Sequence, residues 1–314
     1  MSGKAFVRME YARINYISPN ERKERSQIVK STSTSAINVN QLFQQAHNEG
    51  TLSAQSLQTL EQIDIGVQIQ AGLGVSVENV HASEVILVTM MVDDSGSIRF
   101  SGNAQTVREG HNTVLDALAA SKQSGGILSH TCYLNGTILF PYLPMSILDD
   151  LMKKRTGVVR YVPNPLVVRM DTKNYDPNEG TPLYDQTVVL LGRVLPKYQE
   201  FAEAGVMART ITLIITDGAD EHSTTASAAS VKSLVQDLIG ENHIVAGMGI
   251  AGGGQEPFRN IFRQMGIPDQ WILTPGSNSS EIRKAFQVFS QSAVRASQGA
   301  AQFNQTGAGG FLTA

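Results

Sequence analysis

Hydrophobic positions between residues 84 and 298 alternate between two kinds of pattern along the chain. Continuous apolar runs, typical of strands that are buried on both faces, alternate with stretches whose apolar positions recur every three to four residues, as on an amphipathic helix. The predicted strands are 85–92, 127–134, 137–140, 210–216, 243–250 and 271–273. The predicted helices are 103–124, 183–201, 231–238, 256–265 and one that begins at the Asn278 cap. This order predicts an α/β fold: a doubly wound, mostly parallel, Rossmann-like sheet with helices on both faces.

The two flanks of this region have different patterns. Residues 1–35 are polar and predict an arm, residues 37–64 predict two short helices, and residues 67–80 predict an extra strand at the sheet edge. The end of the chain is rich in Gln, Ala and Gly, which favours a mobile tail. We therefore expect an N-terminal extension at 1–83, one domain at 84–298 and a flexible tail at 299–314.

Three polar segments interrupt the apolar runs where side chains can converge. The first strand stops at Asp93-Asp94-Ser95-Gly96-Ser97, and the strand at 210–216 stops at Asp217. Thr181 precedes a predicted helix. Ligands of doubly wound sheets bind beyond the carboxyl ends of the strands, so these oxygens are expected to meet there. Carboxylates and hydroxyls without sulfur or imidazole suit a hard cation such as Mg²⁺, with Mn²⁺ or Ca²⁺ as alternatives.

The three segments together resemble the von Willebrand factor A (vWA) family and its metal-ion-dependent adhesion site. Asp93, Ser95 and Ser97 match the Asp-x-Ser-x-Ser part, Thr181 matches the threonine in Gly-Thr-Pro-Leu, and Asp217 matches the aspartate in Thr-Asp-Gly. The resemblance implies a non-enzymatic module in which an Asp or Glu of a protein partner completes the metal coordination. The compact size, the segment from Gly180 to Asp185 and the sequence from Phe286 to Ser292 also look similar to small bacterial vWA proteins of tellurium-resistance and stress-response clusters. This similarity implies work beside AAA+ ATPases, kinases or phosphatases.

Several expectations about the site's surroundings follow. Asp93 and Asp217 are expected at exposed loop ends, so that their replacement by alanine leaves the fold intact. Asp94 is expected to be a solvated carboxylate that, with Asp220 and Glu221, makes the rim acidic. His222 is interpreted as part of a charged loop rather than as a metal ligand.

Other functions remain open or are disfavoured by the sequence. A turn with a helix cap explains most isolated Asp-x-Ser strings. A metal-assisted phosphohydrolase using the same five residues, or a structural subunit of a larger assembly, stays an alternative. The Gly247-to-Gly252 string fits a dinucleotide pattern, but it begins inside a predicted strand. Cys132 lies in mid-strand and is more typical of a core residue than of a nucleophile.

Composition adds limits on location and partners. A net charge of −3 does not indicate the basic surface that is typical of nucleic-acid-binding proteins. The single cysteine excludes a disulfide within the chain, and no apolar segment is long enough for a secretory signal or a membrane span. We therefore expect a cytoplasmic protein that binds neither nucleic acid nor a membrane.

Overall fold

The computed structural model describes residues 38–63, 66–153, 167–239, 242–250 and 255–311. Its centre is a six-stranded sheet in the order β3-β2-β1-β4-β5-β6. All neighbouring strands are parallel except the pair β2–β3. The strands are β1 (Glu84–Val92), β2 (Ile127–Tyr133), β3 (Ile138–Pro144), β4 (Met207–Thr216), β5 (His243–Gly249) and β6 (Ile272–Leu273). The predicted α/β fold with a mostly parallel sheet is confirmed.

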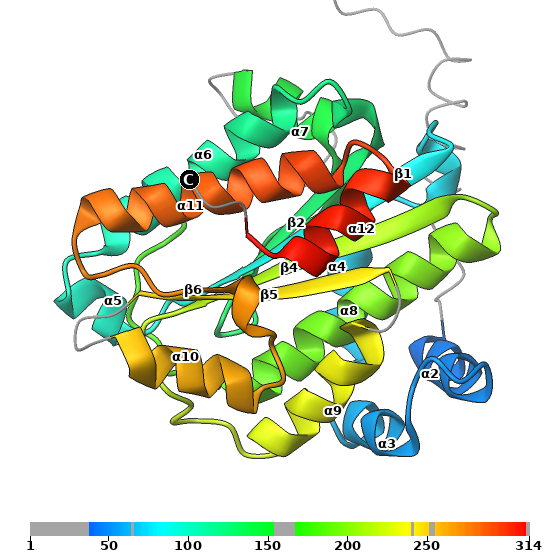
Figure 1. Cartoon of the computed structure of the whole chain (residues 1–314), viewed down its shortest axis with the longest axis horizontal. Helices are drawn as coiled ribbons and strands as arrows, with labels where there is room; N and C mark the ends of the chain where they lie inside the picture. The colour runs from blue at the N-terminus through cyan, green and yellow to red at the C-terminus, as the bar shows by residue number, and fades with distance from the viewer. Residues whose placement is uncertain (1–37, 64–65, 154–166, 240–241, 251–254, 312–314) are drawn as a thin grey trace, which may run out of the picture. The chain divides into compact units, whose positions relative to one another are not determined.

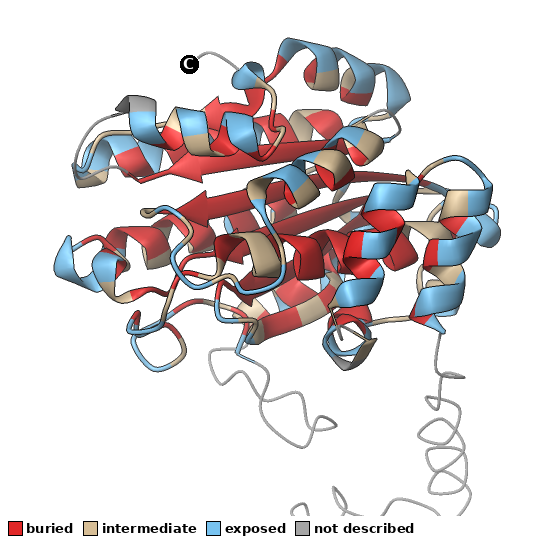
Figure 2. Ribbon diagram, turned by 90° about the horizontal axis from the view of Figure 1, so that it is seen from below, coloured by how far each residue is buried: buried red, intermediate tan, exposed pale blue. Residues whose placement is uncertain are grey.

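Helices cover both faces of this sheet (Figure 1). One face carries α6 (Ala104–Ala119), α7 (Met145–Lys153), α11 (Ser279–Ala296) and α12 (Ala300–Gly309). The other carries α4 (Gly66–Leu73), α8 (Leu183–Glu203), α9 (Ala228–Ile239) and α10 (Gln255–Gln264). Figure 2 shows the buried strands between helices whose outer sides are exposed. Every residue of β1 after Glu84 is buried, as expected for a strand that is covered on both faces.

The predicted hairpin between β2 and β3 is present. The N–H of Tyr133 donates to the carbonyl of Thr137 at 2.8 Å, and the N–H of Gly136 donates to the carbonyl of Tyr133 at 3.0 Å. Gly136 has φ +92°, a conformation that favours glycine and is typical of the Asn-Gly hairpin turn. This hairpin gives the sheet its antiparallel edge.

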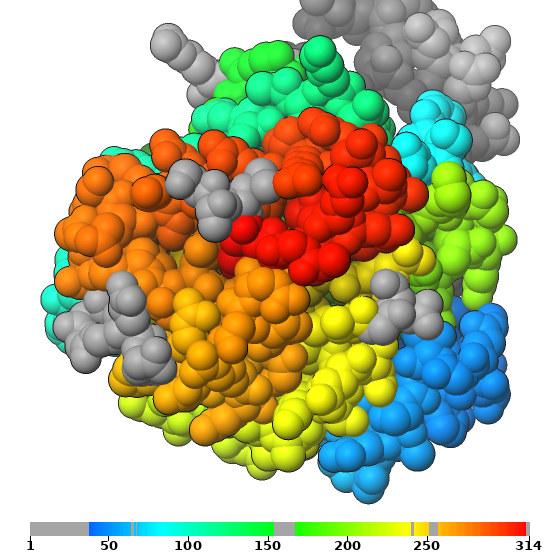
Figure 3. Space-filling model, in the orientation of Figure 1, coloured from blue at the N-terminus to red at the C-terminus, as the bar shows by residue number. Residues whose placement is uncertain are grey.

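Helices α2 (Val39–Asn48) and α3 (Ala54–Gln62) confirm the two short helices predicted before the sheet. Figure 3 shows them in blue at the surface, with α3 beside α9 in yellow. The backbone N–H and the hydroxyl of Ser53 both donate to the carboxylate of Asp237 in α9, each at 2.8 Å. The described part of the N-terminal extension therefore packs on the outer side of the helical layer. The predicted arm at 1–35 lies outside the described residues, and the boundary at 83/84 stays a prediction.

The predicted edge strand at 67–80 is wrong, because 67–73 belong to the helix α4 and Val77–Asn79 form a 3-10 turn. Ile69 and Leu73, four residues apart, are both buried, as on one side of a helix. Only the N–H of Val75 reaches the edge strand β3, where it donates to the carbonyl of Tyr142 at 3.0 Å. The short apolar run fitted either element, and packing of α4 against α8 and β3 selected the helix.

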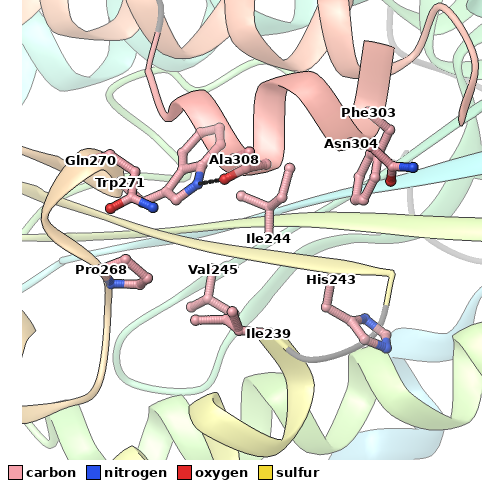
Figure 4. Close-up of a pocket in the computed structure, with 11 residues that line it drawn as sticks. Ile239, His243, Ile244, Val245, Pro268, Gln270, Trp271, Phe303, Asn304 and Ala308 are labelled. Carbon is pink, nitrogen blue, oxygen red and sulfur yellow. Dashed lines mark hydrogen bonds between the residues drawn. The ribbon is translucent and has the colours of Figure 1, made fainter. Parts of the chain in front are cut away.

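Within the segment 299–314, for which a flexible tail is predicted, the residues Ala300–Gly309 form the helix α12. Phe303 and Thr306 are buried, and Nε1 of Trp271 donates to the carbonyl of Gly307 at 3.1 Å. A cavity of about 190 Å³ lies between α12 and the first half of β5, lined by Ile244 and Phe303 among others (Figure 4). Packing against Trp271 therefore orders a segment whose composition alone is typical of a mobile tail.

Candidate metal site at the carboxyl ends of the strands

The candidate site lies where β1 and β4 end. Asp93 follows β1, and its N–H donates to the carbonyl of Ile215 in β4 at 3.0 Å, so that Asp93 lies beside Thr216 and Asp217. Ser95 and Ser97 lie at the start of the short helix α5 (Gly96–Phe100), at the left edge of Figure 1. Strand pairing thus brings two segments that are more than a hundred residues apart to one point.

Hydroxyl and carboxylate oxygens meet at this point. The Oγ atoms of Ser95 and Ser97 are 2.9 Å apart. The hydroxyl of Ser97 donates to Oδ1 of Asp217 at 2.6 Å, and that of Ser95 approaches the same oxygen at 3.5 Å. A hydroxyl that donates its proton to a carboxylate keeps its lone pairs, so both serines can still coordinate a cation.

Asp93 is fully buried and held by hydrogen bonds, which corrects the expectation of an exposed loop end. Its Oδ1 accepts from the N–H of Ser95 at 2.8 Å. Its Oδ2 accepts from the hydroxyl of Thr216 at 2.7 Å and from the N–H of Asp217 at 3.2 Å. The carboxylate therefore organises the turn after β1 and contributes its negative charge from below the surface.

Thr181 is brought to the same place by the loop after β4. Its carbonyl accepts from the N–H groups of Glu221 and His222 at 3.1 and 3.3 Å, and its own N–H donates to Nδ1 of His222 at 2.9 Å. Its methyl group lies 3.8 Å from the position of a Cβ added to Gly218, the residue after Asp217. All three predicted segments therefore lie together, with Thr181 almost completely buried.

Burial disfavours the charged forms of two carboxyl groups, Asp217 and Asp94. Burial raises the pKa of Asp217 to about 6, opposed by the hydrogen bond from Ser97 and reinforced by the charge of Asp93. Burial also raises the pKa of Asp94 to about 7, opposed by the N–H of Asn135 and reinforced by Asp93. A divalent ion would reverse both shifts, because it favours the ionised carboxylates.

The expectation of a solvated Asp94 is wrong. Its side chain is buried, and Oδ1 accepts from the N–H of Asn135 at 3.1 Å. Its carbonyl accepts from the N–H groups of Asn178 and Glu179 at 2.8 and 3.0 Å. Asp94 thus ties β1 to two distant loops and does not contribute to an acidic rim.

Three supporting residues were not recognised from the sequence. The hydroxyl of Tyr175 donates to the carbonyl of Asp93, and the carboxylate of Asp185 accepts from the N–H groups of Thr224 and Ala226 at 2.8 and 2.6 Å. His222 accepts from Thr181, as described above. Each contact joins segments at least 39 residues apart, and no local pattern signals such pairs.

The residues present fit a hard cation. No group of three or more His, Cys, Asp or Glu side chains gathers as a metal site in the described residues, so the donors here are two carboxylates supplemented by hydroxyls. Mg²⁺ prefers about six oxygen ligands and keeps several waters, which a site open at Ser97 allows. Assignment of the five residues as ligands stays a prediction.

No helix in the described part of the chain is long and apolar enough to cross a membrane.

Comparisons with known proteins add structural likenesses only. No protein-family model and no curated protein matches the chain. Proximal thread matrix protein 1 from the mussel byssus is 15% identical with a TM-score of 0.43, over 65% of this chain and 46% of that protein. The vWF domain of the type V pili tip protein Mfa5 from Porphyromonas gingivalis is 9% identical with a TM-score of 0.46, over 70% of this chain and 98% of that domain. Manganese-loaded TRAP from Plasmodium vivax is 18% identical with a TM-score of 0.37, over 66% and 74%.

The chain thus spans less than half the length of the byssus protein. One structure of that protein has a zinc-occupied MIDAS motif. With TM-scores below 0.5, these likenesses carry no assignment of function. The α/β fold rests on the strand order and pairing of this chain itself.

Proposed function

We propose that this protein is a non-enzymatic interaction module that binds a carboxylate of a protein partner through a divalent cation at an adhesion-type site. The observation that carries the proposal is the meeting of Ser97 and Asp217, whose Oγ and Oδ1 atoms lie 2.6 Å apart although the two residues are 120 positions apart in the chain. These oxygens lie at the end of the sheet where ligands of doubly wound folds bind.

In this proposal the five residues have different tasks. Asp217 and Ser97 hold the ion from the accessible side, buried Ser95 and Thr181 supply further hydroxyls, and buried Asp93 neutralises charge and orients the turn. The bound cation supplies a Lewis-acid position for an Asp or Glu of the partner. Two carboxylates nearly neutralise Mg²⁺, so an additional carboxylate meets little net repulsion and can take an open coordination position of the ion.

The arrangement favours binding over hydrolysis. A metal-assisted phosphohydrolase needs a group that can take a proton from water, and often a second metal. Both oxygens of Asp93 already accept hydrogen bonds, and Nδ1 of His222 accepts from Thr181. Asp93 and Nδ1 of His222 are thus engaged in holding the loops of the site.

The finer parts of the proposal come from the sequence. Mg²⁺ as the cellular ion is proposed from the oxygen-only ligands, a cytoplasmic location from the composition, and a place in a bacterial stress or defence system from the family resemblance. An AAA+ ATPase, a kinase or a phosphatase is the proposed partner class, and none of these parts follows from geometry alone.

A metal titration tests the proposal directly. Mn²⁺, which suits the same oxygen ligands and has an EPR signal when free, is titrated into the full chain. We expect one site per chain, competition by Mg²⁺, and a large loss of affinity in Ser97→Ala. Ser146→Ala serves as the matched control, because Ser146 is exposed in α7, which follows the antiparallel strand β3 and therefore lies at the opposite end of the sheet.

Carboxylate capture is then tested with two short peptides that differ only in Asp or Asn. Coordination of the Asp side chain displaces water from bound Mn²⁺, which lowers the enhancement of water proton relaxation, and the Asn peptide should have little effect. Absence of a stoichiometric Mn²⁺ site would contradict the proposal. Turnover of a generic phosphate ester that is lost in Ser97→Ala would favour the hydrolase instead.

A further inference from the structure

One exposed aromatic residue lies beside the candidate metal site. Phe100, at the end of α5, is 83% exposed, more than the other large hydrophobic residues exposed in the described part of the chain. Single exposed hydrophobic residues are common on protein surfaces, so exposure alone indicates nothing. What distinguishes Phe100 is its place on the helix that begins with two of the proposed metal ligands.

The ring of Phe100 lies against the residue between those two ligands. A Cβ added to Gly96 would be 3.5 Å from Cε2 of Phe100 and 3.9 Å from Cδ2. Gly96 separates Ser95 from Ser97, whose hydroxyl oxygens are 2.9 Å apart. The ring therefore lies beside the turn that carries both serines. Phe100 also follows Ser97 by three residues on the same helix, the spacing of neighbours on a helix surface, so a residue bound at Ser97 would bring its sequence neighbours toward the ring.

Arg99 gives the same side of the site a positive charge. Its guanidinium carbon is 5.6 Å from the centroid of the Phe100 ring, and Nη2 donates to the amide oxygen of Asn178 at 3.0 Å. The neutral amide leaves the guanidinium charge uncompensated by that contact. The loop of Asn178 is in turn bonded to the carbonyl of Asp94, so Arg99 is held by the framework of the site.

The rim is therefore asymmetric. The α5 side carries the aromatic ring of Phe100 and the guanidinium of Arg99, whereas the loop after β4 carries exposed Glu221 and His222. Asp94, which the sequence places in an acidic rim, is buried and does not contribute its charge there. Charge complementarity thus places an acidic segment of the partner on the α5 side, where the bound metal ion and Arg99 both attract carboxylates.

We propose that Phe100 and Arg99 form a second docking element next to the metal, for a partner segment in which the coordinating Asp or Glu is adjacent to a large apolar residue. This inference rests on the proposed function and names the kind of sequence that the site selects. The apolar side chain packs on the ring of Phe100, while Arg99 attracts the acidic segment as it approaches.

Matched peptides test this preference with the Mn²⁺-loaded full chain. The peptides are N-acetylated and C-amidated Gly-Leu-Asp-Gly, Gly-Ser-Asp-Gly and Gly-Leu-Asn-Gly, and the readout is the loss of water proton relaxation enhancement. We expect Gly-Leu-Asp-Gly to bind roughly fivefold more tightly than Gly-Ser-Asp-Gly, which corresponds to about 1 kcal/mol. Gly-Leu-Asn-Gly should have little effect, because it lacks the carboxylate.

Two variants separate the ring from a general surface effect. Phe100→Ser should bind both aspartate peptides equally, with unchanged Mn²⁺ affinity. Met207→Ser is the matched control: Met207 is 61% exposed and lies at the start of β4, at the opposite end of the strand from Asp217, so it should keep the fivefold preference. Arg99→Gln should lower the affinity for both aspartate peptides while preserving the ratio of the two affinities.

The outcomes distinguish this inference from the proposed function. Equal binding of the leucine and serine peptides to the wild type, or a preference that survives in Phe100→Ser, overturns the docking element alone. A lack of Mn²⁺ binding, or the same response to the Asp and Asn peptides, overturns the proposed function and this inference with it.

Discussion

The backbone N–H of Thr181 donates to Nδ1 of His222 at 2.9 Å, and the N–H of His222 in turn donates to the carbonyl of Thr181 at 3.3 Å. This reciprocal pair joins the loop before α8 to the loop after β4. A Cβ added to the neighbouring Gly180 would be 3.0 Å from the imidazole ring, so the glycine allows the close approach. His222 thus positions Thr181 without having to touch the cation itself.

Loss of the imidazole acceptor should weaken metal binding through Thr181. We expect His222→Ala to raise the Mn²⁺ dissociation constant about threefold to tenfold, the range of one net hydrogen bond. His222→Asn should stay within about twofold of wild type, because the Asn amide can place an acceptor near the position of Nδ1. EPR titration measures both constants, and the exposed His81→Ala serves as the control. Equal effects of the Ala and Asn substitutions would contradict the positioning role.

Three buried histidines should make the fold sensitive to acid. Burial lowers the pKa of His111 to about 4 and those of His130 and His243 to about 3, from an ordinary 6.5. Below pH 6.5 the unfolded chain binds protons that the folded chain does not, so the free energy of unfolding falls as the pH decreases toward these folded pKa values.

Replacing one of these histidines should therefore reduce the acid sensitivity. We expect His243→Gln to lose roughly 2 kcal/mol less stability than wild type between pH 7 and pH 5. Urea unfolding at the two pH values measures the difference, even if the variant is less stable at both. The exposed His81→Gln should follow the wild-type dependence. A His243→Gln curve parallel to that of wild type would show that His243 titrates normally in the folded state.

The contact between α6 and α11 depends on the absence of a side chain at Gly110. A Cβ there would lie 2.1 Å from Cδ2 of Phe286, a fully buried residue whose ring has little room to move. We expect Gly110→Ala to destabilise the protein by about 1–3 kcal/mol, despite the better helix propensity of alanine. Chemical denaturation measures this loss. Gly125→Ala, where the added Cβ meets nothing within 4 Å, is the control and should change stability little.

The sequence predicted those features that depend on local pattern. The apolar run before Asp93 and the helical spacing in α6 and α8 were sufficient for the α/β architecture, because burial on both faces leaves a strong signal. Polar residues directly after two such strands also predicted which side chains would converge. Sheet topology fixes where parallel strands end, so this step did not require knowledge of loop structure.

Features that depend on contacts between distant segments were not predictable in this way. Asp94 is buried because Asn135 and the loop at Asn178 close over it, and neither contact is visible in the string Asp93–Ser97. Residues 67–80 carried a short apolar run that fits a strand or a helix equally well. The Ala- and Gly-rich end of the chain forms α12 because Trp271 packs there.

Replacing Asp217 or Asp93 by an uncharged residue should change the stability of the fold in opposite directions. The pKa of Asp217 is raised from 3.8 to about 6, so without metal the free energy of unfolding falls as the pH rises from 3.8 toward 6, and the loss is complete above that value. At pH 7.5 without metal, we expect Asp217→Asn to raise the melting temperature by about 2 °C, allowing for the partial exposure of the group. Asp93→Ala should instead lower stability by about 2–3 kcal/mol, because the groups of Ser95, Thr216 and Asp217 that donate to it lose a buried acceptor.

Added Mg²⁺ should then reverse the order of wild type and Asp217→Asn. A ligand that binds only the folded state raises its stability in proportion to the logarithm of its concentration, so millimolar Mg²⁺ should raise the melting temperature of wild type. Asp217→Asn has lost one carboxylate of the site and should not respond. Differential scanning fluorimetry with Mg²⁺ and then with excess EDTA measures both states of each protein. A wild-type melting temperature that ignores Mg²⁺, or an equal rise in Asp217→Asn, would mean that the ion does not bind between these carboxylates.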